Sequence, residues 1–598
     1  AAATTLAVGS FILNGLIPLS ERLQALEKWN PYYWYAAGRP LTTGILPEGV
    51  ALLLGLSLLC LGIEVLISDA AMSFPDISPL LQSLAALHTL ITLWLALYGL
   101  HSWALLVLFW VLRRRPSAAR KTLRRFKPPR AKGKTSGDDF LPSVTVQIPI
   151  YNERHVVRRI IDATANLDYP RDRLEIQVLD DSTDETTRIA EARAAFWRER
   201  GVNIRVLHRP DRSGFKAGAL AWGLTQARGE LIAVFDADFC PRPDFLKQVV
   251  PYFQTDPRLG MVQTRWSHLN ADYSIVTCAQ AMALDGHFAV EQTARSQAGL
   301  LMHFNGTGGV WRRACIEESG GWQSDTVCED LDLSYRAQLR GWRALYLPDV
   351  DCPGELPPQV LAFKQQQARW AKGSVQCLRK LARPLLLSRT VGPIRKFCGL
   401  LHLSGYLVHP LMILLLLLTP AVLVVPSPLG EISRVLGIVC LGPILSYVTS
   451  QWALYPDWIR RLRAFPAMAL IGTGIAWNNS RAILEGLTHW GGTFIRTPKF
   501  RLEGRRGNWQ RSHYRLTADW SVLGEIGLAI YALGVTGMAW TLGKWGIVPF
   551  LLLYVGAFGL VAGLSLRETW APRPQRRGRF RSSFLAPPPS RSVRPSEK

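Results

Sequence analysis

Acidic residues gather at three points of the sequence where a short apolar run stops. Pro149-Ile-Tyr151-Asn-Glu153 ends the first run, Asp180-Asp181 the second, and Asp236-Ala-Asp238 a later one. If these runs are strands of one parallel sheet, their acids meet at a single edge. A divalent cation relieves the repulsion between them, and hard oxygen ligands suit Mg²⁺ or Mn²⁺. Such a cation could bridge the protein and a diphosphate leaving group.

Each of these motifs also has a plainer interpretation. An Asp-x-Asp is common in turns, Asp184 could cap the next helix, and Tyr151 and Asn152 could be ordinary loop residues. Their joint occurrence at consecutive strand ends nevertheless favours a ligand site. Lys216, in Gly214-Phe-Lys-Ala-Gly, opens the following helix and could place a positive charge near the phosphates.

Two later motifs suit transfer of a sugar to a hydroxyl group. In Cys328-Glu329-Asp330, a carboxylate could deprotonate the acceptor hydroxyl, and Asp330 is our choice of base. It could equally be a helix N-cap. In Gln365-Gln-Gln-Ala-Arg-Trp370, the indole could stack on a pyranose while Gln and Arg bind hydroxyls and phosphate. The alternative is an amphipathic helix at a membrane surface, where Trp is also enriched.

The elements that position these motifs form an α/β domain. We expect strands at Val144–Pro149, Leu174–Val178, Ile204–Leu207 and Leu231–Phe235, separated by amphipathic stretches. This alternation predicts a doubly wound, mainly parallel sheet within residues 141–385.

The composition indicates that this domain is inserted between membrane helices. Hydrophobic residues make up 48% of the 598 residues and charged residues only 19%. The net charge of +24 does not indicate nucleic acid, because the basic residues follow apolar runs, as on the cytoplasmic side of a membrane. The nine cysteines show no Cys-x-x-Cys pair and predict neither a disulfide framework nor a zinc site.

Apolar runs near the ~20 residues that a spanning helix needs occur on both sides of the domain. The predicted spans are Val50–Ile67, Leu84–Leu112, Leu400–Val425, Val435–Leu454, Val522–Leu542 and Val548–Leu566. Thr5–Leu19 is ambiguous, and the amphipathic Phe465–Leu487 suits an interfacial helix better than a span.

This pattern divides the chain into six segments. Residues 1–45 are uncertain, and Asn30-Pro-Tyr-Tyr-Trp-Tyr resembles the end of an ABC-type permease. Residues 46–112 carry two spans, 113–140 a basic linker, 141–385 the α/β domain, 386–570 interfacial and spanning helices, and 571–598 a disordered basic tail. The basic loops place the domain in the cytoplasm.

Taken together, the motifs resemble those of processive family 2 glycosyltransferases of the cellulose-synthase-like group. The family signature D, D-x-D, [T/C]-E-D and Q-x-x-R-W appears in order as Asp180-Asp181, Asp236-Ala-Asp238, Cys328-Glu-Asp330 and Gln366-Gln-Ala-Arg369-Trp370. Val262-Gln-Thr-Arg-Trp and Phe304-Asn-Gly-Thr-Gly-Gly-Val-Trp look close to plant mannan and glucan synthase-like proteins.

The resemblance implies a GT-A-type fold and a role for each motif. Asp238 would hold the metal, Asp330 would act as base with Glu329 beside it, and the first Asp pair would contact the nucleotide base. The remaining assignments are Tyr151, Glu153, Asp180, Asp181, Lys216 and Asp236 to the donor, and Asn305, Gly306, Gln366, Arg369 and Trp370 to the acceptor.

Phe494-Ile-Arg-Thr497-Pro-Lys499 resembles the F-x-V-T-x-K gating loop of bacterial cellulose synthase. Arg496 replaces Val, so gating by Phe494, Thr497 and Lys499 is an analogy.

We therefore expect an inverting membrane glycosyltransferase in a bacterial inner membrane, with Mg²⁺ or Mn²⁺ as cofactor and no nucleic-acid partner. The preferred reaction is transfer of glucose from UDP-glucose to a growing β-glucan that leaves through a channel between the spans. The alternatives are a β-mannan synthase that uses GDP-mannose and a glucosyl-diacylglycerol synthase with a lipid acceptor. A transporter component would leave the carboxylate motifs unexplained.

Overall fold

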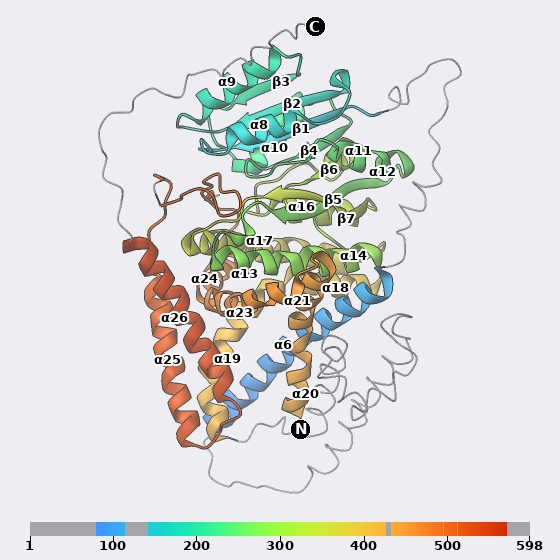
Figure 1. Ribbon diagram of the computed structural model, residues 1–598. Helices are drawn as coiled ribbons and strands as arrows, with labels where there is room; N and C mark the ends of the chain where they lie inside the picture. The colour runs from blue at the N-terminus through green and yellow to red at the C-terminus, as the bar shows by residue number, and fades with distance from the viewer. Residues whose placement is uncertain (1–78, 114–140, 426–431, 494, 511, 571–598) are drawn as a thin grey trace, which may run out of the picture.

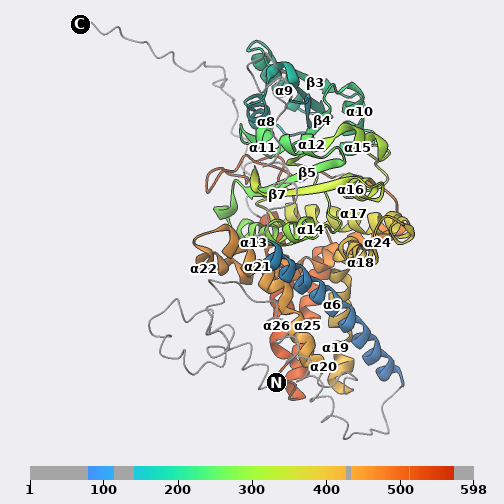
Figure 2. The ribbon, with the colours of Figure 1, turned by 90° about the vertical axis from the view of Figure 1, so that its right-hand side faces the viewer.

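The computed structural model describes residues 79–113, 141–425, 432–493, 495–510 and 512–570. They form an α/β domain above a bundle of long helices, with shorter helices lying crosswise between the two (Figures 1 and 2). The predicted span Val50–Ile67, the uncertain segment 1–45, nearly all of the linker and the tail 571–598 lie outside the described residues.

The α/β domain contains a seven-stranded sheet in the order β3-β2-β1-β4-β6-β5-β7. Its first four strands are β1 (Val144–Ile150), β2 (Leu174–Asp180), β3 (Ile204–His208) and β4 (Leu231–Val234). These pair in parallel and end within two residues of the predicted bounds. The apolar runs of β1, β2 and β4 are almost wholly buried, as is usual for strands inside a parallel sheet. Helices α8 (Val157–Ala165), α9 (Thr186–Arg198) and α10 (Phe215–Gln226) connect them.

The second half of the sheet contains β5 (Leu259–His268), β6 (Gly309–Arg312) and β7 (Arg343–Gly354). Strand β6 is antiparallel to both β4 and β5, whereas β5 and β7 are parallel. The sheet is thus mixed but mainly parallel, as expected. Because β6 begins where β4 ends, with Gly309 opposite Val234, the loop before β6 reaches the edge that carries Asp236.

Two apolar clusters cover the sheet, one on each face. The first contains Ile148, Ile176 and Val262 and includes side chains from α8 and α9, and the second contains Leu220, Trp311 and Leu333. The remaining elements of this half are the short helices α11 (Phe245–Val249), α12 (Pro251–Thr255) and α15 (Arg313–Glu318), and α16 (Glu329–Leu339).

Crosswise helices separate the sheet from the bundle (Figure 1). They include α13 (Ile275–Asp285), which continues through the π-helical turn η6 (Gly286–Gln292) into α14 (Thr293–Gln297), and the long α17 (Val360–Leu387). Helices α18 (Pro393–Leu403), α23 (Phe465–Gly474) and α24 (Ala476–Thr488) adjoin them. The predicted interfacial stretch Phe465–Leu487 is therefore two helices that meet at Ile475.

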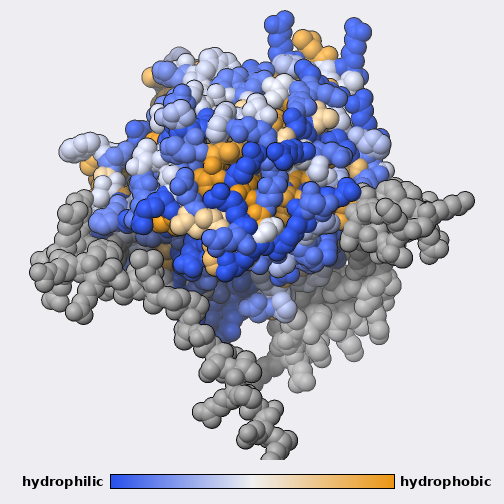
Figure 3. All heavy atoms as spheres, turned by 90° about the horizontal axis from the view of Figure 1, so that it is seen from above, coloured by the Kyte–Doolittle hydropathy of each residue, from blue (hydrophilic) through white to orange (hydrophobic). Residues whose placement is uncertain are grey.

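Five described helices are long and apolar enough to cross a membrane: Pro79–Leu112, Gly405–Val424, Leu436–Leu454, Val522–Thr541 and Val548–Trp570. They correspond to α6 (Pro79–Leu112), α19 (Val408–Val424), the end of α20 (Ile432–Val439) with α21 (Leu441–Leu454), α25 (Val522–Thr541) and α26 (Val548–Trp570). Apolar side chains such as Ile530 and Phe550 point outward and are more than half exposed, as a lipid environment requires. The opposite end of the molecule is predominantly hydrophilic (Figure 3).

Candidate active site

A cavity that is open to solvent lies at the carboxyl ends of β1, β2 and β4, where a doubly wound sheet binds ligands. It collects the predicted site residues from the sheet, α16, α17 and the segment after α24. Phe494 lies outside the described residues, and Asp180 does not line the cavity. The predicted residues that do are Tyr151, Glu153, Asp181, Lys216, Asp236, Asp238, Asn305, Gly306, Glu329, Asp330, Gln366, Arg369, Trp370, Thr497 and Lys499.

Asp180 is fully buried beneath the loop that follows β2. Its carboxylate accepts hydrogen bonds from the Ser182 backbone N–H at 2.9 Å and the Thr187 hydroxyl at 2.6 Å, and it lies 2.9 Å from Nδ1 of His208. These partners belong to the loop after β2, to α9 and to β3. Asp180 therefore shapes the loop that presents Asp181, and the predicted contact with the donor is not supported by its position.

Asp181 is held by a residue that the sequence motifs did not reveal. Arg209 donates from Nε at 2.7 Å and from Nη2 at 2.6 Å to the two carboxylate oxygens, a bidentate pair that fixes the plane of the acid. Nearby, the guanidinium of Arg212 lies 3.4 Å from the ring centroid of Tyr151. A flat cationic and aromatic surface thus lies beside Asp181. Neither arginine belongs to a motif with fixed spacing, so neither could be predicted from the sequence.

Lys216 lies at the centre of the acidic cluster. Its ammonium is 2.7 Å from Asp236 Oδ1 and 3.6 Å from Glu329 Oε1, and it donates to the carbonyl of Gly306 at 2.9 Å. Burial by itself lowers the pKa of Lys216, but the adjacent Asp236 and Glu329 carboxylates reverse this and raise the pKa above its usual value. The lysine is therefore a permanent cation at the strand ends. Burial raises the pKa of Asp236.

Asp330 is in the first turn of α16, facing the cavity. One of its oxygens accepts the Leu331 backbone N–H at 2.8 Å. Burial raises the pKa of Asp330 to about 7, and the neighbouring Glu329 carboxylate adds to this effect. A carboxylate with such a pKa is matched to general-base catalysis near neutral pH. The N-cap of α16 is Cys328, so Asp330 does not take the capping role that the sequence left open.

Gly306 allows the loop before β6 to pass close to this acid. Its φ of +83° is in the left-handed region, and a Cβ built there would lie 2.9 Å from Asp330 Oδ2 and 3.3 Å from Lys216 Nζ. The following residue, Thr307, accepts the Asp236 backbone N–H at 2.8 Å. The loop therefore joins the Asp-x-Asp turn to the base.

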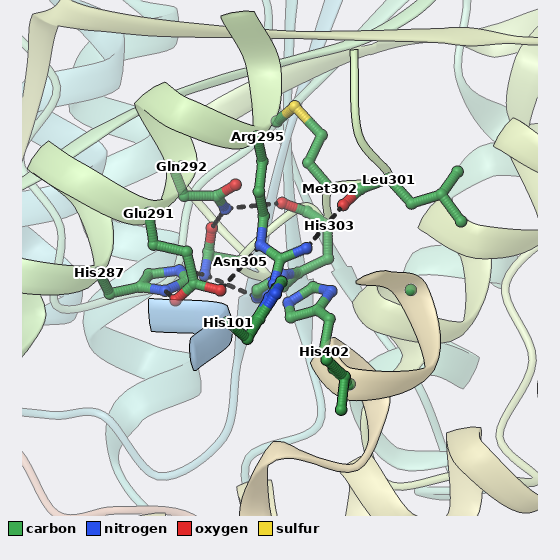
Figure 4. A network of polar contacts seen from close by, with 12 residues as sticks. His101, His287, Glu291, Gln292, Arg295, Leu301, Met302, His303, Asn305 and His402 are labelled. Atoms are coloured by element: carbon green, nitrogen blue, oxygen red, sulfur yellow. Dashed lines mark hydrogen bonds and ion pairs between the residues drawn. The ribbon is translucent and has the colours of Figure 1, made fainter. Parts of the chain in front are cut away.

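Asn305 is tied to a polar network on the membrane side of the cavity (Figure 4). Its amide nitrogen is 3.0 Å from Nε2 of His287 and 2.9 Å from Nε2 of His303, and its oxygen accepts from Gln292 at 2.7 Å. Burial lowers the pKa of His303 to about 3, so this imidazole is neutral and accepts.

The network continues from His287 through Glu291 and Arg295 to His101 of α6. The amide of Asn305 is thus oriented by the network, which limits its capacity to bind an acceptor directly.

The segment after α24 lies against the cavity. We call residues 495–510 and 512–518 the strap. Arg496 donates to Glu153 at 2.9 Å, and Lys499 donates to Asp238 at 2.5 Å and to the Glu355 carbonyl at 2.9 Å. Burial raises the pKa of Glu153 to about 7, although Arg496 opposes this.

Further along the strap, Tyr514 donates to Asp184, which also accepts the Thr186 backbone N–H at 2.9 Å near the start of α9. The N-cap of α9 is Glu185, so Asp184 stabilises the turn before the helix and does not take the N-cap position that the sequence left open. The strap contacts both Glu153 and Asp238, so it meets the residues predicted for donor and metal.

The residues at the Asp-x-Asp turn fit a divalent cation. Asp236 and Asp238 supply hard oxygen donors, and a cation bound with a nucleotide needs only one or two protein carboxylates, because phosphates supply other ligands. Accordingly, the described residues contain no cluster of three or more His, Cys, Asp or Glu side chains arranged for a metal. Lys499 is the charge that such a cation would replace at Asp238.

The comparisons with known proteins agree with this geometry. Residues 142–373 match the model described as glycosyltransferase like family 2. Glucomannan 4-beta-mannosyltransferase 2 of Arabidopsis thaliana is 40% identical over 321 residues, which are 53% of this chain and 59% of that protein. Probable glucomannan 4-beta-mannosyltransferase 7 of Oryza sativa subsp. japonica is 44% identical over 260 residues, 43% of this chain and 44% of that protein.

The chain thus spans less than two thirds of the length of these relatives. Among solved structures, a mannosyltransferase from Pyrobaculum calidifontis in complex with GDP-Man and Mn²⁺ is 24% identical, with a TM-score of 0.43, and the match covers 68% of this chain and 99% of that one. Residues 142–373 form a family 2 glycosyltransferase domain, held between helices of membrane-spanning length.

Proposed function

We propose that the protein is an inverting membrane β-mannosyltransferase that transfers mannose from GDP-mannose to a β-linked glycan. The observation that carries the reaction type is the convergence of Lys216, Asp236, Asp238 and Asp330 in one cavity at the strand ends. The sugar is supported by the relatives, which are named as glucomannan 4-beta-mannosyltransferases. They favour the mannan alternative over transfer from UDP-glucose, our first preference from the sequence.

The proposed reaction is a single displacement. Asp330 removes the proton from the attacking hydroxyl while that oxygen bonds to the anomeric carbon of the donor. The bond between this carbon and the diphosphate oxygen breaks, and its electron pair leaves with GDP. Lys216 balances the charge that grows on the diphosphate. A divalent cation at Asp236 and Asp238 would supply further neutralisation of that charge.

The acceptor enters from the side of α17. Gln366, Arg369 and Trp370 line the cavity on the face opposite the strand ends, and an indole face is suited to the apolar face of a sugar ring. We assign these three residues to the acceptor, with Gly306 as a close-approach position and Asn305 as part of its support. The strap is proposed to close over the donor and to open as the product leaves, in which case Thr497 and Lys499 take the gating role.

Five described helices are long and apolar enough to cross a membrane, and we propose that the protein lies in one with its domain facing the cytoplasm. The basic segment after α6 supports this orientation. The assignment to a bacterial inner membrane stays a prediction.

The test is a transfer assay in lipid with purified protein. It supplies radiolabelled GDP-mannose or UDP-glucose, Mg²⁺ or Mn²⁺, and a manno-oligosaccharide primer. We expect incorporation from GDP-mannose into product that an endo-β-1,4-mannanase degrades and a cellulase leaves intact. Incorporation from UDP-glucose alone, or into a single-sugar lipid extracted by organic solvent, would contradict the proposal.

A further inference from the structure

The start of α17 is capped by a side chain from a distant membrane helix. Its N-cap residue Gln359 makes no side-chain capping hydrogen bond. Instead, the backbone N–H groups of Val360 and Leu361 donate to the Glu568 carboxylate at 2.7 and 3.2 Å. Glu568 belongs to α26 and is only 8% exposed. A carboxylate here satisfies the free N–H groups and interacts favourably with the helix dipole.

A second carboxylate from the bundle holds the next turn. Glu525 of α25 is fully buried and forms an ion pair with Lys364, whose side chain is 6% exposed. A buried charge is costly unless it is paired, so each of these residues requires the other. The backbone carbonyl of Lys364 also accepts from Asn478 of α24 at 2.8 Å. The first turns of α17 are thus fixed by α24, α25 and α26.

The strap ends at the same place. Arg515 donates to the backbone carbonyls of Glu568 and Thr569, the latter at 3.0 Å. The backbone N–H of Leu516 donates to the side chain of Gln359 at 3.2 Å, and that of Ala518 donates to the Thr569 hydroxyl at 2.8 Å. We call this meeting point of the strap, the end of α26 and the start of α17 the joint.

The joint lies between two parts of the cavity. On one side, the strap leads back to Tyr514, which donates to Asp184, and to Lys499, which donates to Asp238. On the other side, α17 leads to Arg369 and Trp370 on the cavity wall. Ten helical residues separate Val360 from Trp370, which is about 15 Å along the axis. A change in the direction of the first turn therefore displaces the indole.

We infer that Glu568 is a positioning residue for the acceptor: it fixes α17 against the bundle and the strap so that Gln366, Arg369 and Trp370 face the cavity. The inference rests on the proposed function for its kinetic consequence but on geometry alone for the anchoring. Because the strap and α17 share one anchor, the donor side and the acceptor side are mechanically linked at Glu568.

The decisive variant is Glu568→Gln, which keeps the size of the side chain and removes its charge. The amide offers a single oxygen acceptor, and its NH₂ group faces one of the two backbone N–H donors. We expect the KM for a manno-oligosaccharide acceptor to rise about tenfold, since two charge-assisted hydrogen bonds are weakened. The Kd for GDP is expected to change less than about twofold. Hydrogen exchange in the first turn of α17 should accelerate by a similar factor to the KM change.

Glu485→Gln is the matched control. Glu485 also contacts α17, at Lys372, but the two charged atoms are 3.5 Å apart and Glu485 is 59% exposed. Its removal should therefore alter neither the acceptor KM nor hydrogen exchange in the first turn of α17. Combination of Glu568→Gln with Trp370→Ala supplies a second test. If Glu568 acts through the indole of Trp370, the increase in acceptor KM in the double variant is smaller than the product of the increases in the two single variants.

Unchanged exchange in α17 and an unchanged acceptor KM would overturn the inference. So would equal losses of GDP affinity and acceptor affinity with a lower melting temperature, because these indicate general destabilisation. If the unaltered protein transfers sugar from neither donor, the proposed function fails, and hydrogen exchange alone still decides whether Glu568 anchors α17.

Discussion

Replacement of Asp330 by Asn tests the assignment of the base. The amide has the same shape but cannot take a proton, and loss of a general base costs about 10²- to 10⁴-fold in kcat, or roughly 3–5 kcal/mol of transition-state stabilisation. Donor binding should survive. The ion pairs of Lys216 with Asp236 at 2.7 Å and Glu329 at 3.6 Å remain in the variant, so the charges around the proposed diphosphate site are largely unchanged.

The assay has two parts. Release of GDP in the presence of GDP-mannose and primer measures kcat, and calorimetric titration with GDP and Mn²⁺ measures donor affinity. Asp325→Asn is the matched control, because Asp325 precedes the same helix but is 47% exposed and pairs with Lys380 at the surface. We expect its kcat to stay within about twofold of the unaltered protein.

Two results would refute the reasoning. If Asp330→Asn keeps kcat within threefold, the proton is taken by another group, and Glu329 becomes the first alternative. If it abolishes GDP binding together with kcat, Asp330 is part of the donor site rather than the base.

Three further predictions follow from distances and charges in the cavity. Because burial raises the pKa of Asp330 to about 7, and only the ionised form accepts a proton, kcat/KM should fall about tenfold per pH unit below neutrality; a flat pH–rate profile down to pH 5 would contradict this. Gly306→Ala places a Cβ 2.9 Å from Asp330 Oδ2 at a φ of +83°, so kcat should fall on the order of 10²-fold with little change in GDP affinity, and full activity would refute the close approach. Lys499→Ala removes the ammonium 2.5 Å from Asp238, so half-saturation of GDP binding should need roughly tenfold less Mn²⁺; an unchanged requirement would show that the lysine and the cation do not compete.

The sequence predicted the site best where acidic residues stand at the ends of strands. Strands β1, β2 and β4 are short apolar runs that stop at acidic residues, and parallel pairing then brings Asp181 and Asp236 to one edge without further information. The resemblance to the family signature also predicted that Asp330, on α16, and Trp370, on α17, belong to the same site. The mainly parallel α/β sheet and the long apolar helices are confirmed, and residues 142–373 match the model described as glycosyltransferase like family 2.

Other features depend on tertiary contacts that have no local pattern. Asp180 and Asp181 are adjacent and identical in type, yet β2 ends at Asp180, whose carboxylate is held beneath the loop, whereas Asp181 belongs to the loop and lines the cavity. Arg209 and Glu568 act across long sequence separations, so no spacing rule identifies them. The antiparallel direction of β6 was likewise not predicted, although it is what brings Gly306 to the base.

The identity of the sugar donor could not be predicted from the motifs either. Carboxylates that surround a diphosphate are common to glucose and mannose donors, and the shape of the sugar pocket is set by several elements at once. Mannose is therefore proposed as the donor sugar in place of glucose because of the similarity to proteins named as glucomannan 4-beta-mannosyltransferases, not because of any motif.

The most direct test of the central claim is an experimental structure with GDP and Mn²⁺ bound. We expect the cation at Asp236 and Asp238, the diphosphate within reach of Lys216, the ammonium of Lys499 moved off Asp238, and Asp330 facing open space beside Trp370. A nucleotide bound away from the strand ends, or a cation that contacts neither aspartate, would contradict it.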